Sequence, residues 1–304
     1  MRELSLDDLP KHSPWPARLL GREDWDEQAG FGGIGVSVYD EVYGKLLSLA
    51  RANPEMDYRA VQRSANHHAE ESPVAISRGE SLYLVDVDEK QELQDEALVA
   101  SFAGTLSGGE TVVALGCGWG YELGVLADAY PDCEFVGGDP AENGVALARE
   151  LFADRDRITV GEFDFRDDRW DLLEDVLADG SADDGTGADD GRNAEGSEGT
   201  GDVVLFTQGS LTALPSVRDV ISETLADYLD RVRTGVHLEH VFELHPEDTL
   251  LGQLRRSYTD RREYNDDLLT ALRATDGIEI ASATYDVVGG NPLHPLSEIR
   301  WEAV

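Results

Sequence analysis

Hydrophobic residues follow two patterns that alternate along most of the chain. Short apolar runs, bounded by glycine, proline or acidic residues, predict buried strands. Longer segments with apolar residues at helical spacing lie between them and predict amphipathic helices. The alternation predicts an α/β fold. The expected strands are residues 112–115, 134–138, 158–160, 202–207, 236–242, 278–288 and 297–301.

The helical pattern is clearest over residues 216–232, where seven apolar side chains share one face. A second long segment, 250–272, is also expected to be one helix. The remaining helices of this part of the chain are expected at residues 88–106, 121–130, 140–152 and 170–177.

Residues 1–85 stand apart from this alternating part, so we expect two units, 1–85 and 86–304. The first unit is predicted to be a mainly helical extension, with helices at 40–52 and 58–68 and a short strand within 78–86. Asp40 is the expected N-cap of the first helix. Two interpretations stay open: a lid that helps to build a substrate pocket, or an extension for packing or oligomer contact.

Three glycines at alternate positions follow the first predicted strand of the alternating part, in the sequence TVVALGCGWGY. Gly116, Gly118 and Gly120 allow positive φ angles and a close approach of a ligand to the main chain. The helix that starts at Tyr121 offers free N–H groups at its N-terminus. A strand, a glycine turn and a helix together predict a ligand-binding turn.

Two acids follow at the ends of the next two predicted strands. Asp139 ends the strand 134–138, where a carboxylate can accept hydrogen bonds from both hydroxyls of a ribose. Asp164, followed by Phe165, comes shortly after the strand 158–160. With the glycine turn, these residues resemble the class I S-adenosylmethionine-dependent methyltransferases over residues 89–304.

The resemblance implies a Rossmann-like, mostly parallel seven-stranded sheet whose last strand is antiparallel. It also implies S-adenosylmethionine as the cofactor, with the glycines facing its methionine part, Asp139 its ribose, and Asp164 with Phe165 its adenine. Gln208 and Gly209 follow the strand 202–207 and would face the transferred methyl group. The expected cofactor contacts are Gly116, Cys117, Gly118, Gly120, Asp139, Pro140, Asp164, Phe165, Gln208 and Gly209.

One position departs from the pattern of this family. The family usually has Asp or Glu two residues before the first glycine, where this chain has Ala114. The methionine amine must then be held by backbone carbonyls or by a residue from elsewhere. Two alternatives stay open: a non-catalytic accessory protein that binds the cofactor, and a nicotinamide-dependent oxidoreductase. Tyr121 opposes the oxidoreductase, because it occupies the last small position of a dinucleotide fingerprint.

Candidate catalytic groups gather near the C-terminal end of the strand 236–242, the end at which ligands bind in open α/β sheets. We expect His240 or His245 to act as general base toward an acceptor hydroxyl, with Glu239 or Glu243 orienting it. His294, in the turn before the last strand, is expected to lie away from the ligand end and to be structural.

Features of the acceptor are also predicted. The segment FTQGS, residues 206–210, lacks the motifs of methyltransferases that act on base nitrogens or on pyrimidine carbon-5. The segment 250–272 resembles, less specifically, the substrate-side helix of methyltransferases that modify sugars. Tyr258, Tyr264 and Asn265 would therefore contact the substrate, and aromatic rings can stack on a sugar face. The expected acceptor is a hydroxyl of a sugar or glycan precursor.

The net charge of the chain indicates the solvent in which the protein works and not the chemistry of its site. The 304-residue chain has 62 Asp plus Glu against 25 Lys plus Arg, for a formal net charge of −37. Such self-repulsion is screened in molar salt, where the Debye length falls to about 3 Å. Lysine occurs only at positions 11, 45 and 90. This composition is typical of a halophilic archaeal protein.

The remaining features mainly exclude classes of function. Nucleic-acid binding is disfavoured because basic clusters are short. Cys117 and Cys133 suggest neither a metal site nor a disulfide framework. Residues 179–201 form an acidic, glycine-rich insertion that cannot bury a core. We expect a cytoplasmic protein with a small-molecule substrate, no resident metal, no membrane contact, and room for a homo-oligomer.

Overall fold

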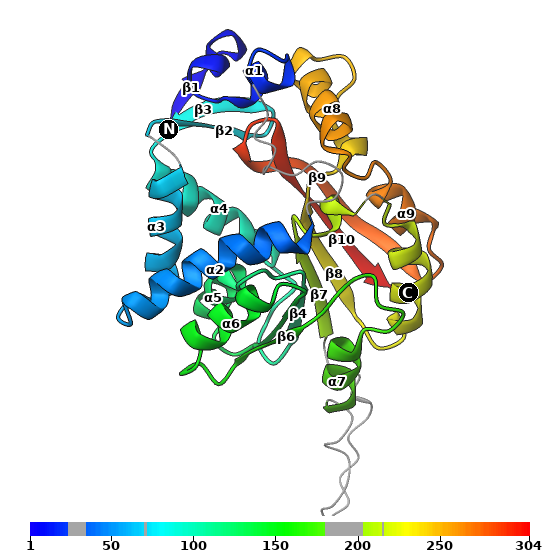
Figure 1. The fold of residues 1–304 in the computed structure, drawn as a ribbon. Coiled ribbons are helices and arrows are strands. Elements are labelled where there is room, and N and C mark those ends of the chain that lie inside the picture. Colours follow the sequence, from blue (N-terminus) through cyan, green and yellow to red (C-terminus); the bar gives the residue numbers. More distant parts are fainter. Residues whose placement is uncertain (24–34, 70–71, 180–202, 215) are drawn as a thin grey trace, which may run out of the picture.

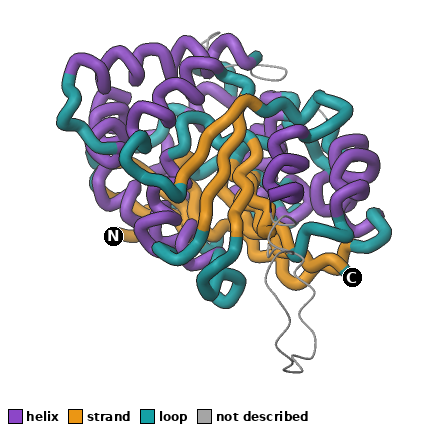
Figure 2. Tube along the Cα trace, turned by 90° about the horizontal axis from the view of Figure 1, so that it is seen from below, coloured by secondary structure: helices purple, strands orange, loops and turns teal. Residues whose placement is uncertain are grey.

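The computed structural model describes residues 1–23, 35–69, 72–179, 203–214 and 216–304. The acidic insertion, apart from Asp179, lies outside these residues. One ten-stranded sheet runs through the described molecule, with helices on both of its faces (Figures 1 and 2). No helix among the described residues is long and apolar enough to cross a bilayer.

The strands confirm the predicted α/β class and add two, β1 and β2, to the eight that were expected. The order across the sheet is β1-β3-β2-β9-β10-β8-β7-β4-β5-β6. The strand bounds are β1 Arg2–Leu4, β2 Val74–Arg78, β3 Ser81–Val85, β4 Thr111–Leu115, β5 Glu134–Asp139, β6 Ile158–Glu162, β7 Val203–Gln208, β8 Thr234–Glu239, β9 Ile278–Asn291 and β10 His294–Ala303.

Seven adjacent strands form the unit that the resemblance implies. Strands β4 to β8 pair in parallel, in the order β6-β5-β4-β7-β8. Strand β10 pairs antiparallel with both β8 and β9. The antiparallel last strand is therefore confirmed. Parallel pairing brings the C-terminal ends of β4 to β8 to one edge of the sheet, where ligands bind in this class of fold.

The helices cover the two faces separately. One face of the parallel strands packs against α2 to α6, and the other against α7, the helical segment near residue 220, and α9. The helix bounds are α1 Trp15–Leu19, α2 Val36–Ala52, α3 Tyr58–Ala69, α4 Val87–Ser101, α5 Tyr121–Ala129, α6 Glu142–Leu151, α7 Asp171–Asp179, α8 Leu250–Arg262 and α9 Leu268–Ala274.

Two predicted helices differ from expectation in regularity. The segment 216–232 buries the periodic apolar side chains as predicted, but it is a π-helix at Val220–Thr224 and a 3₁₀-helix at Leu225–Tyr228. The segment 250–272 is two helices, because α8 ends at Glu263, which takes a left-handed conformation with φ of 52°. The periodicity therefore predicted the buried face correctly, but it did not predict the type of helix or the break between α8 and α9.

Residues 1–85 contribute strands as well as helices. Strands β1 and β3 pair with each other, β3 pairs with β2, and Ser77 of β2 pairs with Gly289 of β9, so the sheet is continuous with the parallel unit. A buried ion pair fixes the join: Arg255 lies 3.0 Å from Asp286, which also accepts hydrogen bonds from the Ser77 hydroxyl and the Glu80 N–H. The strand expected within 78–86 is β3, and the expectation of a mainly helical extension misses β1 and β2.

Helix α2 crosses the molecule in front of α5 and α6 (Figure 1). Its N-cap is Gly35, so the prediction that Asp40 caps this helix is wrong. Asp40 instead accepts hydrogen bonds from the backbone N–H of Asn143, at 2.7 Å, and from its side-chain amide, at 2.8 Å. Because Asn143 lies in the first turn of α6, Asp40 caps the neighbouring helix and fixes α2 beside the ends of the parallel strands.

Candidate functional site

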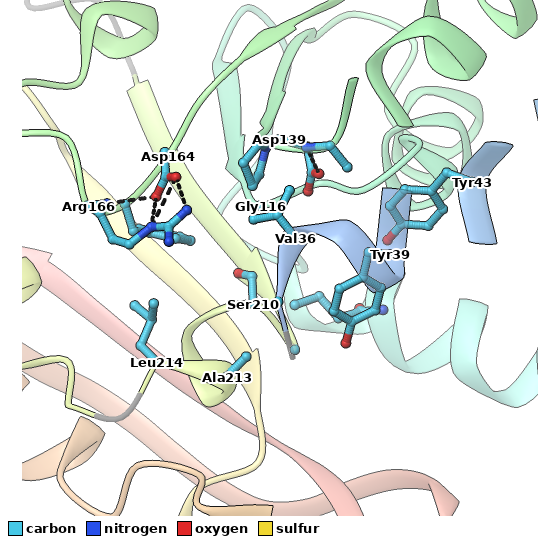
Figure 3. Close-up of a pocket in the computed structure, with 16 residues that line it drawn as sticks. Val36, Tyr39, Tyr43, Gly116, Asp139, Asp164, Arg166, Ser210, Ala213 and Leu214 are labelled. Carbon is cyan, nitrogen blue, oxygen red and sulfur yellow. Dashed lines mark hydrogen bonds and ion pairs between the residues drawn. The ribbon is translucent and has the colours of Figure 1, made fainter. Parts of the chain in front are cut away.

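A cavity of about 510 Å³ opens at the C-terminal ends of the parallel strands (Figure 3). Its wall combines the loops after β4, β5, β6 and β7 with the first two turns of α2. A volume of this size is typical of sites for small molecules and cofactors. The lining residues are Gly35, Val36, Tyr39, Tyr43, Gly116, Asp139, Pro140, Ala141, Asp164, Phe165, Arg166, Gln208, Gly209, Ser210, Ala213 and Leu214.

The glycine turn after β4 places one of its three glycines in the wall. Gly116 has a φ of 74°, and an added Cβ would meet the Ser210 Cβ at 2.4 Å. The Gly116 and Cys117 N–H groups both donate to the Gly138 carbonyl. Because this position combines a positive φ with a close neighbour, only glycine fits it.

The other two glycines are covered by side chains. An added Cβ on Gly118 would lie 2.6 Å from the Tyr43 hydroxyl, and one on Gly120 would lie 3.2 Å from Phe152. Cys117 also lies outside the cavity lining, and burial raises the pKa of its thiol. Gly118, Gly120 and Cys117 therefore shape the turn from behind, whereas Gly116 faces the cavity.

Asp139 lines the cavity at the end of β5 and is 8% exposed. Its carboxylate accepts hydrogen bonds from the Gly118 N–H at 2.7 Å and the Ala141 N–H at 2.9 Å. Burial raises the pKa of this carboxyl, and the two backbone donors oppose the rise. A carboxylate has about four acceptor sites, so Asp139 keeps capacity for two further donors.

Asp164 and Phe165 form the wall beyond β6, with Arg166 beside them. The Arg166 guanidinium binds the Asp164 carboxylate through Nε at 2.8 Å and through a second contact from Nη2 (Figure 3). This pair lowers the pKa of Asp164, so the carboxylate is charged. Phe165 is 9% exposed and stacks edge-on against Phe163.

Helix α2 supplies the opposite wall through two tyrosines that were not among the predicted site residues. Tyr39 and Tyr43 extend from this helix on one side of Gly116, with Asp164 and Arg166 on the other side (Figure 3). Burial raises the pKa of Tyr39 to about 12, so its phenol is neutral at ordinary pH. In the sequence these two tyrosines are one helical turn apart and follow a glycine-rich segment. This pattern does not indicate that they pack beside the glycine turn, which is far away along the chain.

Glu239, a predicted catalytic residue, is fully enclosed and does not line the cavity. Its carboxylate accepts hydrogen bonds from the backbone N–H groups of Ser210, Leu211 and Thr212, at 3.1 to 3.2 Å, and from the Thr212 hydroxyl at 2.6 Å. It therefore holds the loop after β7, including Ser210 of the cavity wall, in place. Burial raises its pKa, and these donors oppose the rise.

The two predicted general bases are buried together with His294, and we call these three residues the histidine cluster. The Nε2 atoms of His240 and His245 are 3.1 Å apart, and the His240 ring stacks on His294 with centroids 4.5 Å apart. The His240 Nε2 also lies 2.6 Å from the Thr259 hydroxyl. None of the three lines the cavity, and burial holds the pKa of each below its usual value. A general-base role for His240 or His245 stays a prediction.

The placement of His294 corrects one expectation. Because β10 runs antiparallel to β8, the start of β10 lies beside the C-terminal end of β8, with Ser297 paired to Glu239. His294 is therefore at the ligand end of the sheet and not away from it. Its contact with His240 follows directly from this register.

The other predicted site residues stabilise the surroundings of the loop after β7. Asn265 is 2% exposed and donates to the Leu211 carbonyl at 2.7 Å, and Glu243 accepts from the Thr270 N–H at 2.9 Å. Tyr258 is buried in an apolar cluster below the N-terminal strands, and Tyr264 packs against that cluster. None of the four lines the cavity, so a substrate contact for Tyr258, Tyr264 and Asn265 stays a prediction.

No group of three or more metal-ligating side chains occurs within the described ranges. Cys117 and Cys133 are both free thiols. Among the described residues the cavity lining consists of backbone, two carboxylates, the Arg166 guanidinium, aromatic rings, and small polar and apolar side chains.

Comparison with known proteins gives structural likeness without sequence likeness. Neither the family models nor the curated proteins searched match the sequence. Mitomycin 7-O-methyltransferase aligns over 70% of this chain and 54% of its own, with 15% identity and a TM-score of 0.45. The pyocyanin biosynthetic protein PhzM aligns over 69% of this chain and 55% of its own, with 12% identity and a TM-score of 0.46.

A third solved structure is the magnesium protoporphyrin IX methyltransferase of Synechocystis PCC 6803 with bound S-adenosylhomocysteine. It aligns over 72% of this chain and 87% of its own, with 14% identity and a TM-score of 0.45. The matched region thus spans about half the length of the first two proteins. The fold of this chain accordingly rests on the strand order described above.

Proposed function

We propose that the protein is an S-adenosylmethionine-dependent methyltransferase that methylates a hydroxyl of a small polar molecule. The observation that carries the proposal is the single cavity wall formed by the ends of four parallel strands. Gly116, Asp139, Asp164 with Phe165, and Gln208 with Gly209 come from successive loops and line one space. These are the positions at which the family resemblance implies cofactor contacts.

The residues present fit an adenosyl cofactor. Asp139 would hold the ribose hydroxyls, because it keeps free acceptor capacity beside the open turn at Gly116. Phe165 would lie against the adenine, with Asp164 and Arg166 at its polar edge. The loop at Gln208 and Gly209 would border the methionine part. Bound S-adenosylmethionine supplies an activated methyl group on a sulfonium.

The contribution of the chain is mainly alignment and exclusion of water. Tyr39 and Tyr43 cover the cavity from α2, and the Asp40 contact to Asn143 fixes this helix in place. Glu239 fixes Ser210 on the other side through three backbone donors. Both walls are therefore held by carboxylate contacts outside the cavity, which suits a site that positions two reactants.

The acceptor end of the cavity is formed by Val36, Tyr39, Ala213 and Leu214. This surface is apolar with one phenol, so it suits a small molecule that presents a hydroxyl beside a carbon skeleton. Tyr39 takes the place that Tyr258 and Tyr264 were expected to have, since aromatic rings stack on sugar faces. A sugar or glycan-precursor hydroxyl remains our proposed acceptor, in a haloarchaeal cytoplasm at molar salt.

Calorimetry in molar salt tests the cofactor proposal. S-adenosylmethionine and S-adenosylhomocysteine should bind at a one-to-one ratio, whereas NAD should not. Methyl release with sugars, nucleotide sugars and simple phenols then tests the acceptor. Binding of NAD without binding of either adenosyl compound would contradict the proposal. Binding without methyl release to any acceptor would favour the accessory-protein alternative.

A further inference from the structure

Three glutamates beside the parallel strands differ in how many donors their carboxylates have. Glu239 has the four donors described above. Glu110, which is 1% exposed, accepts from the Ser107 and Gly108 N–H groups and the Ser107 hydroxyl, and its pKa is lowered to about 2. Glu122 has one side-chain donor, the Gln208 amide at 3.0 Å. Only Glu122 of the three retains most of its acceptor capacity.

The surroundings of Glu122 offer no positive charge. No lysine or arginine of the described chain lies within ion-pair distance of it, and the nearest acidic influence is Asp95 on α4. Burial, with a smaller contribution from the charge of Asp95, raises the pKa of Glu122 to about 7. Glu122 is half-buried, and a cationic donor from a ligand would stabilise its charged form.

Glu122 lies close to Ala114, the position at which the family usually has an acid. A small cavity behind the turn is lined by Ala114, Leu115, Gly116, Cys117, Glu122, Phe206, Thr207 and Gln208. Gly116 and Gln208 belong to this cavity and also to the large one. Gln208, which is hydrogen-bonded to the Glu122 carboxylate, therefore lines both cavities.

Resting on the proposed function, we propose that Glu122 binds the primary ammonium of the cofactor's amino-acid tail and replaces the acid that is missing at position 114. Its place in the first turn of α5, beside the Gly116 end of the cavity, puts the carboxylate where the methionine part is expected. Gln208 orients the carboxylate by donating to one oxygen and leaves the other oxygen for the ligand.

Ligands that differ only in this tail test the assignment. S-adenosylhomocysteine carries the ammonium and a carboxylate, 5′-deoxy-5′-(3-aminopropylthio)adenosine carries the amine alone, and 5′-methylthioadenosine carries neither. In Glu122→Gln the affinity for the first two should fall about tenfold or more, since a hydrogen bond to a charged group is lost. The affinity for methylthioadenosine should stay within about twofold, because its contacts are unchanged.

A matched variant controls for charge at a helix start. Glu142 is exposed in the first turn of α6, so Glu142→Gln removes a similar charge without reaching the small cavity, and all three affinities should be retained. Equal losses for all three ligands in Glu122→Gln, or no loss for any, would overturn the assignment. If the wild-type protein bound none of the three, the proposed function itself would be wrong.

Should Glu122→Gln fail to fold, the wild-type protein provides the second measurement. The difference in affinity between S-adenosylhomocysteine and methylthioadenosine should then widen as pH rises through the titration of Glu122. A difference that is constant with pH would count against the assignment.

Discussion

The cavity wall and the closed polar interior beside it use similar residues at the same edge of the sheet, yet their polar atoms are satisfied differently. In the interior, Glu239 has four donors from its own chain, and His240 and His245 are hydrogen-bonded to each other. Asp139 of the wall has two donors, and Glu122, which lines the small cavity behind the glycine turn, has one side-chain donor.

The difference separates supporting groups from binding groups. A buried carboxylate saturated by backbone N–H groups stabilises a loop, and exposing those donors by mutation costs stability. A carboxylate with unused acceptor sites next to a cavity can take donors from a ligand. Residue type and distance from a strand end do not distinguish the two, whereas the count of donors does.

The largest effect is expected from breaking the interior, with Glu239→Ala. Removing the carboxylate leaves three backbone N–H groups and the Thr212 hydroxyl without their acceptor, at a cost of about 3 to 5 kcal/mol in the free energy of unfolding. Urea unfolding at fixed molar salt measures this as a lower midpoint with an unchanged slope. Glu239→Gln keeps one acceptor oxygen and should lose less. An unfolding free energy within about 0.5 kcal/mol of wild type in Glu239→Ala would show that the donors are satisfied without it.

Much of the fold could be predicted because its signals are local. The run before Gly116, the acid that ends β5 and the antiparallel last strand are each encoded within a few residues. Strands β1 and β2 were missed because β1 is three residues long and β2 joins the sheet through a pair more than 200 residues apart, Ser77 with Gly289. Pairing across such a distance leaves no pattern in either segment.

The cavity lining also contains residues with a local sequence signal and residues placed by contacts between distant segments. Asp139, Phe165, Gln208 and Gly209 could be predicted because each lies at, or within three residues of, the C-terminal end of a parallel strand. Tyr39 and Tyr43 reach the cavity only through the packing of α2 on α6, held by Asp40 and Asn143, which are 103 residues apart. The enclosure of Glu239, His240 and His245 could not be predicted, because proximity to a strand end does not reveal which neighbours surround a side chain.

An intermediate effect is expected at the wall, with Asp139→Asn. The substitution removes the charge and half of the acceptor capacity that would hold the ribose, so affinity should fall about 10- to 100-fold. Unlike Glu122→Gln, this variant should weaken S-adenosylhomocysteine and methylthioadenosine equally, because both carry the ribose. Calorimetry with the two ligands makes the comparison. A loss confined to one of them would place Asp139 away from the ribose.

The smallest effect is the expected pH dependence of ligand affinity in the wild-type protein. The folded pKa of Glu122, about 7, lies above its ordinary value of 4.5, so the protonated form is favoured in the free protein and the charged form in a complex with an ammonium. Affinity for S-adenosylhomocysteine should therefore rise about tenfold from pH ~6 to pH ~8 and then level off.

The groups that face Glu122 are Asp95 on α4, Cys117 in the glycine turn and Tyr43 on α2. The pKa values of Cys117 and Tyr43 are raised, so both stay neutral over this range. Methylthioadenosine reports any titration that acts on the nucleoside part, Asp139 included, and its affinity should change little. Because protonation of Glu122 favours the folded protein but opposes the ammonium, binding should weaken toward acid pH without a parallel loss of stability from this group. If the affinities for both ligands rose equally with pH, the titrating group would act on the nucleoside contacts that the ligands share, and not through Glu122.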